Sequence, residues 1–324
     1  MLATWTATPS FSGPLPRASI PTVPLTNGVE FPMISLGTGG YNSSVASDAF
    51  TLALGINFTA VDTALDYGNQ PGLAGVIASV SRDKVFVLSK VPGCGDAPIQ
   101  PQTEAGCYNA TLTALHTDLS QLQLSHVDAM LLHSPPTGEV SGCSSAKACK
   151  LIQAQWKAME EFYKAGGAKS IGVSNYCESC IECVKKSATV KPMINQIQYH
   201  AGMGPGPTKA LLKYCADEGV LVQAYAPLGG STSVHPDDPY PLIHNAALAG
   251  IGKKYQKSAV QVALRFVLQQ GLPLATKSDR RDFMVEDTDV WDFALSDAEM
   301  TAIDAIRDAA HASSAWYADP HEIA

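Results

Sequence analysis

The chain has 324 residues, of which 46% are hydrophobic and 16% are charged, and its formal net charge at pH 7 is −8. This composition is typical of a globular protein with a sizeable core and excludes a largely disordered chain. The acidic balance argues against nucleic acid or an anionic membrane as the main partner, and no apolar run approaches the length of a membrane span.

The amino-terminal segment predicts a tail followed by a hairpin. Met1 to Arg17 is rich in Thr, Ser and Pro, and lacks the basic start and apolar core of a signal peptide. We therefore expect a tail over residues 1–22, one domain over residues 23–324, and a cytoplasmic location. Within Pro24–Phe31, the Asn27-Gly28 pair lies between short apolar flanks, which indicates a β-hairpin.

From Met33 onward, strand-like runs alternate with helical segments. A closed parallel barrel of eight such units needs about 250 residues or more. An open doubly wound sheet has the same alternation, but no G-x-G-x-x-G follows the first strand, which weighs against a dinucleotide-binding open sheet. We therefore predict a (β/α)8 TIM barrel. The expected strands are Met33–Leu36, Phe58–Asp62, Val85–Lys90, Val127–His133, Ala168–Val173, Met193–Gln198, Val220–Ala226 and Leu272–Thr276.

The segments between these runs carry helical signals. Thr111–Leu124 and Ile152–Lys164 place apolar residues at helical spacing. Ser258–Gln261 and Ser296–Glu299 each fit a capping box, and Gly271 ends the first of these two helices.

The 8 cysteines leave their chemistry open. Cys94 and Cys107 bracket one loop-like segment and Cys143 and Cys149 bracket another, as disulfides in an oxidising compartment would. N-x-S/T sequons at Asn42, Asn57 and Asn109 favour the secretory pathway as well, although such sequons often occur by chance. Because no signal peptide is recognisable, we expect reduced thiols.

Three further cysteines, Cys177, Cys180 and Cys183, recur at three-residue spacing on a predicted helix. That spacing invites a zinc site. A single helix cannot easily wrap three thiolates around one ion, however. We therefore expect no metal.

Polar groups end three successive predicted strands. The second strand ends at Asp62 with Tyr67 just beyond it, the third ends at Lys90, and the fourth ends at His133. Each group alone would be explained by a turn or a solvated side chain. The carboxyl ends of barrel strands meet at one rim, where active sites lie, so together these groups predict a site.

The chemistry of this set suits protonation of an oxygen atom. An unperturbed tyrosine has a pKa of about 10, which a nearby Lys90 ammonium would lower, and Asp62 would hold that lysine charged. His133 would orient a carbonyl oxygen by hydrogen bonding. No strand end offers a Ser–His–Asp set or a close carboxylate pair, so acyl transfer and glycoside hydrolysis fit less well.

From about Leu25 to Ile306 the chain resembles the aldo-keto reductase family. The resemblance implies a (β/α)8 barrel whose hairpin closes the amino-terminal end, and NADPH-dependent reduction of a small carbonyl substrate by hydride transfer. It implies that Tyr67 is the general acid, that Lys90 and Asp62 tune it, and that His133 orients the substrate. The motifs are Asp62-Thr63-Ala64 with Tyr67-Gly68-Asn69, Ser89-Lys90, Leu131-Leu132-His133-Ser134-Pro135, Gly172-Val173-Ser174-Asn175, Asn195-Gln196, Tyr225-Ala226-Pro227-Leu228 and Lys277-Ser278.

The resemblance also implies a nicotinamide site. Ser174, Asn175 and Gln196 would hold the carboxamide, and Tyr225 would stack on the ring; amides, a hydroxyl and an aromatic face suit those roles. The other cofactor positions that it implies are Thr38, Asp62, Pro227, Leu228, Lys277, Ser278, Arg280, Phe283, Glu286 and Asp287.

The adenine end departs from the family pattern. Phe283 occupies the place of the family's usual arginine. Lys277, Ser278 and Arg280 would still bind a 2′-phosphate, and Phe283 would stack on adenine. Two aspartates in the same loop add negative charge. The cofactor is therefore expected to be NADPH, with NADH left open.

The expected substrate contacts are Tyr41, Tyr67, His133 and Ser134. Ser134 replaces the tryptophan of many members, and Tyr41 is the expected aromatic wall. The polar segment Pro135–Cys149 and the C-terminal tail around Trp316 and Tyr317 are expected to overhang the pocket.

Two other functions remain open. One is a cofactor-binding or regulatory protein without turnover, and the other is the same enzyme acting mainly as an alcohol dehydrogenase. Aside from a small carbonyl compound, we expect no obligate partner, so that the protein is a monomer or a weak homo-oligomer.

Overall fold

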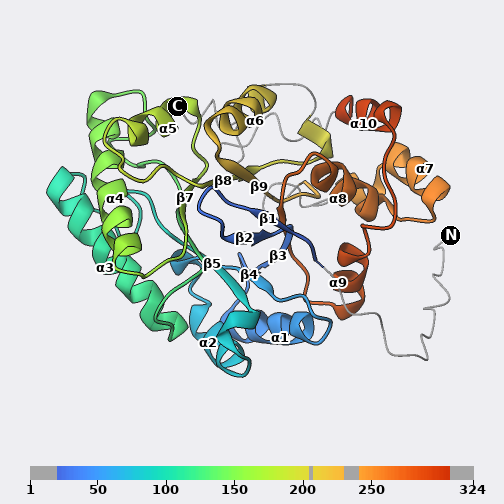
Figure 1. The fold of residues 1–324 in the computed structure, drawn as a ribbon, viewed down its shortest axis with the longest axis horizontal. Coiled ribbons are helices and arrows are strands. Elements are labelled where there is room, and N and C mark those ends of the chain that lie inside the picture. The colour runs from blue at the N-terminus through green and yellow to red at the C-terminus, as the bar shows by residue number, and fades with distance from the viewer. Residues whose placement is uncertain (1–19, 204–206, 230–240, 307–324) are drawn as a thin grey trace.

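The computed structural model describes residues 20–203, 207–229 and 241–306. Eight parallel strands close into a barrel in the order β10-β3-β4-β5-β6-β7-β8-β9, which confirms the predicted (β/α)8 architecture (Figure 1). The barrel strands are β3 (Ile34–Gly37), β4 (Ala60–Asp62), β5 (Phe86–Val91), β6 (Ala129–Leu132), β7 (Ile171–Ser174), β8 (Ile194–Gln198), β9 (Leu221–Tyr225) and β10 (Leu274–Thr276).

The strands form where the sequence has short apolar runs, because both of their faces are covered. Every residue of β4, β6, β7, β8 and β10 is buried. One face packs inside the barrel and the other against helices, so the runs are nearly continuous rather than alternating. All eight predicted strands overlap an observed strand.

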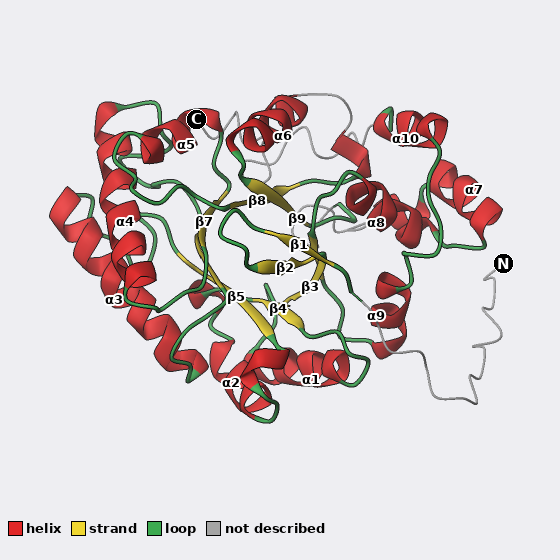
Figure 2. Ribbon diagram, viewed as in Figure 1, coloured by secondary structure: helices red, strands yellow, loops and turns green. Residues whose placement is uncertain are grey.

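Helices surround the strands on all sides (Figure 2). Both predicted capping boxes are present, at Ser258 and Ser296. The α-helices are α1 (Ser43–Leu54), α2 (Gln70–Ala78), α3 (Glu104–Leu122), α4 (Ala146–Lys164), α5 (Glu178–Lys185), α6 (Pro207–Glu218), α7 (Ala246–Tyr255), α8 (Ala259–Gln269), α9 (Arg281–Thr288) and α10 (Asp297–Asp304), and the short 3₁₀ helices are η1 (Leu65–Tyr67), η2 (Arg82–Lys84), η3 (Ala201–Met203) and η4 (Pro241–His244).

Two helices begin earlier than the apolar spacing predicts. Helix α3 starts at Glu104, where the side chain of Thr103 accepts a hydrogen bond from the backbone of Gly106. Helix α4 starts at Ala146, with Ser145 as its cap. In both cases a capping hydroxyl starts the helix before the apolar periodicity is established.

The predicted hairpin is present and lies across the centre of the barrel (Figure 1). It pairs β1 (Thr22–Pro24) with β2 (Glu30–Pro32), and Gly28 adopts the left-handed φ of +83° that its turn requires. Phe31 is fully buried in a cluster with Leu88 and Leu131 from the barrel interior. The hairpin therefore plugs the amino-terminal end of the barrel. Of the expected tail, residues 1–19 lie outside the described part.

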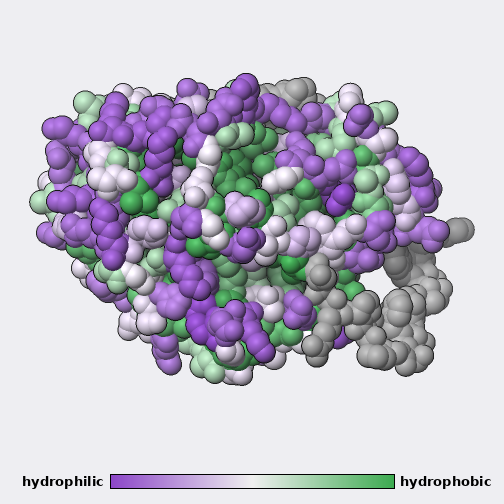
Figure 3. Space-filling model, in the orientation of Figure 1, coloured by the Kyte–Doolittle hydropathy of each residue, from purple (hydrophilic) through white to green (hydrophobic). Residues whose placement is uncertain are grey.

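The face that carries the hairpin is polar around its margin. Hydrophilic side chains cover the surrounding helices, whereas hydrophobic side chains gather near its middle (Figure 3). Among the described residues, no helix is both long enough and apolar enough to cross a membrane.

The expectation of reduced thiols is wrong for six cysteines. Disulfides join Cys94 to Cys107, Cys143 to Cys180 and Cys149 to Cys183. The first pair follows the loop-bracketing pattern, but Cys143 and Cys149 do not pair with each other. Each reaches α5 instead, because the loop before α4 and the start of α4 lie against that helix, at Cα–Cα distances of 5.0 and 5.2 Å.

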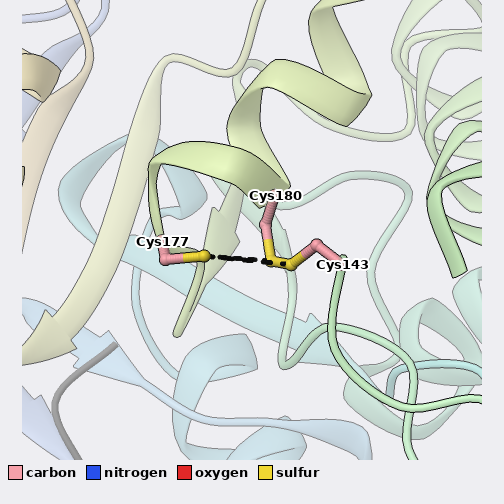
Figure 4. Close-up of side chains that lie close together, drawn as sticks. All are labelled: Cys143, Cys177 and Cys180. Atoms are coloured by element: carbon pink, nitrogen blue, oxygen red, sulfur yellow. Dashed lines mark hydrogen bonds between the residues drawn. A yellow bond between two sulfur atoms is a disulfide. The ribbon is translucent and has the colours of Figure 1, made fainter. Parts of the chain in front are cut away.

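The Cys143–Cys180 bond has a third sulfur beside it. The buried thiol of Cys177 lies 3.5 Å from Cys180 Sγ and 3.9 Å from Cys143 Sγ (Figure 4). These three sulfurs are close enough to share a metal ion. Because two of them are bonded to each other, the cluster offers one thiol rather than three thiolates.

Candidate active site

A buried lysine organises the carboxyl-terminal rim of the barrel. Lys90, on β5, is fully buried, and its Nζ lies 2.5 Å from Asp62 Oδ1 at the end of β4. The same Nζ donates to the carbonyl of Thr63 at 3.1 Å and to the hydroxyl of Tyr67 at 3.5 Å. Asp62, Lys90 and Tyr67, which the sequence places on neighbouring strand ends, are therefore in direct contact.

This environment keeps Lys90 charged. Burial alone would lower the pKa of the lysine, but the Asp62 carboxylate and the Tyr67 hydroxyl outweigh it and raise that pKa above its ordinary value. Gln196, on β8, donates to the second carboxylate oxygen of Asp62 at 2.5 Å. Both oxygens of the carboxylate are thereby used, one by a cation and one by an amide.

The acidity of Tyr67 differs from the expectation. Burial of its hydroxyl raises the pKa of Tyr67, Lys90 lowers it, and Asp62 and Asp66 raise it again, so that the net pKa lies above the usual value of about 10. Lys90 therefore offsets part of the burial penalty and does not make the free phenol more acidic. The sequence shows which charge neighbours the phenol but not how completely the phenol is desolvated.

His133 follows β6 and has a partner that the sequence reading missed. Its Nδ1 lies 3.0 Å from Asp66 Oδ1, and its ring meets the ring of Tyr67 edge-on at 5.5 Å between centroids. Burial would raise the pKa of Asp66, but the hydrogen bond and charge of His133 bring it below its usual value. The only available signal was that Asp66 directly precedes Tyr67.

The residues expected to hold a carboxamide lie together at the ends of β7, β8 and β9. Asn175 Nδ2 donates to the backbone oxygen of His133 at 2.9 Å, and Tyr225 Oη donates to Asn175 Oδ1 at 2.8 Å. Ser174 Oγ donates to the backbone oxygen of Gln196 at 2.8 Å. Asn175 has a left-handed φ of +61°, a conformation in which Asn is enriched.

Three further polar residues stabilise the rim. Gln223, which pairs in register with Gln196 on the adjacent strand, accepts a hydrogen bond from that glutamine at 2.7 Å. Asn69 donates to the backbone oxygens of Thr38 and Tyr41. Thr38, expected as a cofactor contact, is buried and bonds the backbone oxygen of Asp62. These side chains set the positions of the loops that carry Asp62 and Tyr67.

The expected phosphate and adenine residues follow β10. Lys277 Nζ lies 4.3 Å from the centroid of the Tyr41 ring, and burial lowers the pKa of this lysine. The Arg280 guanidinium lies 4.0 Å from the centroid of Phe283 and forms an ion pair with Asp282 at 2.6 Å. Phe283 is 45% exposed. The Arg280 guanidinium therefore contacts the Phe283 ring, but it already has an anionic partner in Asp282.

The remaining residues expected to contact the cofactor differ in their exposure to solvent. Ser278 is buried and bonds the backbone of Arg280. Asp287 is buried and accepts from Thr276 at 2.8 Å, and burial raises its pKa to about 7. Its carboxylate thus braces the end of β10 from within. Pro227 is buried, whereas Leu228 and Glu286 are half-buried.

On the substrate side, Tyr41 and Ser134 are half-buried at the rim. Gly93 lies under the start of the Pro135–Cys149 segment, where an added Cβ would come within 2.5 Å of the Pro135 oxygen. This segment is therefore held against the end of β5 and tied to α5 by its disulfides. The C-terminal tail with Trp316 and Tyr317 lies outside the described residues.

The donor set fits a nicotinamide carboxamide. Ser174, Asn175 and Gln196 lie at adjoining strand ends, where Asn175 Nδ2 donates to Ser174 Oγ and Ser174 Oγ donates to the backbone oxygen of Gln196. One hydroxyl and two amides are the kinds of group that complement the NH₂ and C=O of a carboxamide. The half-buried ring of Tyr225 closes the same corner.

Comparison with known proteins agrees with this geometry. The Aldo/keto reductase family profile matches residues 33–308. Glyoxal reductase of Bacillus subtilis is 32% identical over 295 residues, which cover 90% of this chain and 95% of that protein. Aldo-keto reductase family 1 member A1 of Xenopus tropicalis is 30% identical, with 87% of each chain covered. A crystal structure of an aldo-keto reductase complexed with NADPH superposes with a TM-score of 0.76 at 26% identity, over 89% of this chain and 88% of that one. The chain therefore belongs to the aldo/keto reductase family.

Proposed function

We propose that the protein is an NADPH-dependent oxidoreductase that reduces aldehyde or ketone groups of small molecules to alcohols. The observation that carries this proposal is the buried Lys90, held between the Asp62 carboxylate and the Tyr67 hydroxyl at the carboxyl-terminal rim of the barrel. A buried cation touching a phenol at the site-bearing end of a barrel is suited to proton donation.

Tyr67 supplies the proton. When bound, the nicotinamide cofactor supplies a hydride to the carbonyl carbon, and the carbonyl oxygen gains negative charge as it does so. An alkoxide is a far stronger base than a phenolate, so the raised pKa of Tyr67 does not prevent transfer and keeps the phenol protonated at neutral pH. The Lys90 ammonium stabilises the phenolate that remains, and Asp62 holds Lys90 in place.

The other rim residues bind and orient. His133 donates a hydrogen bond to the carbonyl oxygen, and Ser174, Asn175 and Gln196 hold the carboxamide. Tyr225 covers the nicotinamide ring. Lys277 and Arg280 would bind the 2′-phosphate of NADPH, and Arg280 would then exchange its ion pair with Asp282 for one with the phosphate.

The relatives support this reaction class. One is named a glyoxal reductase, and a structural neighbour was solved with NADPH. Glyoxal is a small dialdehyde, and in this chain the short side chain of Ser134 follows His133 at the rim.

A steady-state comparison of NADPH and NADH across a panel of aldehydes and ketones tests the proposal. We expect oxidation of NADPH that depends on the carbonyl compound, with reactive small aldehydes fastest. Cofactor binding without turnover on the whole panel would instead indicate a silent, regulatory protein. Preference for NADH would contradict the assignment of Lys277 and Arg280 to a 2′-phosphate.

A further inference from the structure

We propose that Cys143, Cys177 and Cys180 form a thiol–disulfide exchange site. In this site the thiol of Cys177 displaces Cys143 from its bond to Cys180 and thereby leaves a free Cys143 thiol in a surface cavity. The three sulfurs lie together beside the start of α5, and none of them belongs to a residue assigned to the carbonyl reduction. The site is therefore an activity beyond the proposed function.

The thiol of Cys177 is directed at the existing disulfide. Its S–H donates to Cys180 Sγ at 3.5 Å, and its sulfur lies 3.9 Å from Cys143 Sγ (Figure 4). A disulfide bond is about 2.05 Å long, so Cys177 Sγ has to approach Cys180 Sγ by only about 1.5 Å to form one. The third sulfur is thus already in contact with the bond that it exchanges.

The local sequence gives Cys180 a second partner within its own helix. Cys177 is the N-cap of α5, and Cys180 follows it in the segment Cys-Glu-Ser-Cys. The backbone nitrogen of Cys180 donates to the backbone oxygen of Cys177 at 3.1 Å, so the two residues share the first turn. Cys-x-x-Cys segments at helix N-termini recur in proteins that exchange thiols and disulfides. Cys180 can therefore bond either to Cys177 or to Cys143 in the loop before α4.

The backbone holds Cys177 in place while Cys143 is carried by a loop. Tyr176, directly before Cys177, is fully buried, and Asn195 on β8 bonds its backbone on both sides. Asn195 accepts from the Tyr176 nitrogen at 3.4 Å and donates to the Tyr176 oxygen at 2.8 Å. Cys143 precedes α4 in the Pro135–Cys149 segment. Because loops move more readily than packed elements, Cys143 is the partner that withdraws when its bond is broken.

The exchange balances within the protein. Cys177 gives up its proton, its sulfur bonds to Cys180 Sγ, and the Cys143–Cys180 bond breaks. The electron pair of the broken bond goes to Cys143 Sγ, which gains a proton. One disulfide replaces another and one thiol replaces another, so the step needs no external oxidant or reductant.

The product thiol faces a cavity of about 550 Å³ at the protein surface. Cys143 and Cys177 both line this cavity, whereas the side chain of Cys180 is fully buried. The segment before α4 stays attached to α5 after the exchange, because the Cys149–Cys183 disulfide takes no part in it. The exchanged protein therefore keeps its fold and presents a Cys143 thiol that small reagents can reach.

The other buried thiol provides a matched control. Cys215, on α6, has the Asn195 amide as its neighbour at 3.8 Å. A buried cysteine in such surroundings behaves as a small apolar side chain. Cys215→Ser removes a thiol outside the cluster and should leave the exchange unchanged.

Trapping with two alkylating reagents tests the exchange without any need for turnover. The native protein is incubated with iodoacetamide in the absence of reductant, and is then unfolded in N-ethylmaleimide, which marks the remaining thiols with a different mass. Trypsin places Cys143 in residues 91–147, and Cys177 and Cys180 in residues 170–185. The Cys143–Cys180 bond links these two peptides, and the exchange separates them.

We expect residues 91–147 to be released with the iodoacetamide mass on Cys143, while Cys177 and Cys180 are joined. The release is lost in Cys177→Ser and in Cys177→Ala, which both remove the attacking sulfur, and it persists in Cys215→Ser. Wild-type protein in which Cys143 lacks the iodoacetamide mass, whichever other cysteine carries it, would overturn the inference. Release of residues 91–147 that persists in both Cys177 variants would overturn it as well.

Discussion

The buried charge of Lys90 determines which residues can surround it at the rim. Lys90 has no contact with solvent, and its charge is matched by Asp62, which also accepts from Gln196. Buried ion pairs gain little net stability over an apolar pair, but removing one partner leaves an uncompensated charge. The pair is thus better explained by its position beside Tyr67 than by stability.

Replacing Lys90 separates these two effects. Lys90→Met should abolish detectable turnover and lower the free energy of unfolding by about 3–5 kcal/mol, because Asp62 is left buried and unpaired. The double variant Lys90→Met with Asp62→Asn should recover most of the stability and none of the activity. Chemical denaturation and steady-state rates measure the two quantities. Retained turnover in Lys90→Met would contradict the assigned role.

Asp118 predicts a pH dependence of stability. It is fully buried, accepts from Gln70 and Ser89 at 2.6 Å each, and burial raises its pKa to about 7. Among the described residues, Asp118 Oδ1 and Gln70 Oε1 have no hydrogen-bond partner, so a proton on the carboxyl group supplies a missing donor.

A carboxyl group with a raised pKa stabilises the fold fully below its unfolded pKa of 3.8, and this stabilisation is lost as the pH rises through about 7. Asp118→Asn removes the charge, so it should be similar to wild type near pH 4 and more stable near pH 8, by at most on the order of 4 kcal/mol. Urea melts at several pH values measure the difference. An equal effect of the substitution at both pH values would contradict a buried, titrating Asp118.

At the scale of elements, the two ends of the barrel have separate tasks. The rim at the carboxyl ends of the strands carries Asp62, Tyr67 and His133, and the opposite end is closed by the hairpin. Phe31 of the hairpin is fully buried and meets Phe86 edge-on at 5.1 Å. A substitution that weakens the hairpin and leaves the rim intact should therefore lower the stability of the fold without changing its catalytic activity.

Phe31→Ala tests this separation. The loss of a buried aromatic ring should cost about 3–5 kcal/mol of unfolding free energy. The kcat of the remaining folded protein should stay within about twofold of wild type, a difference of roughly 0.4 kcal/mol. Thermal melts and rates at low temperature measure the two. A large fall in kcat with an unchanged melt would show that the hairpin acts on the rim.

The disulfides bind elements together and give a further prediction. Cys143 and Cys149 tie the loop before α4 and the start of α4 to α5, directly after Ser174 and Asn175. Peptide mapping without reductant should recover Cys143–Cys180 and Cys149–Cys183, with Cys177 as a thiol. Recovery of Cys143 joined to Cys149 would contradict the fold of this segment.

For the whole molecule, local patterns predicted the scaffold. The short apolar runs located all eight barrel strands, Asn27-Gly28 located the hairpin, and the capping boxes at Ser258 and Ser296 located the start of α8 and α10. Each of these signals lies within a few residues, so the sequence alone contains it.

What the sequence did not predict depends on distant partners or on desolvation. The disulfides of Cys143 and Cys149 span 37 and 34 residues, and Asp66 meets His133 across 67 residues. The raised pKa of Tyr67 follows from burial that only packing creates. Strand order brings Asp62, Tyr67 and Lys90 to one rim, but no local motif marks Asp66, which contacts His133 at that rim.

Tyr67→Phe tests the central claim, that this phenol donates the proton to a carbonyl oxygen. The substitution removes one oxygen atom and keeps the ring that packs against His133. We measure NADPH oxidation with an active aldehyde and, separately, NADPH binding by fluorescence quenching. The account predicts a fall in kcat of at least about a hundredfold, the lower end of what a positioned acid contributes, with NADPH affinity unchanged. An undiminished kcat in Tyr67→Phe would contradict it.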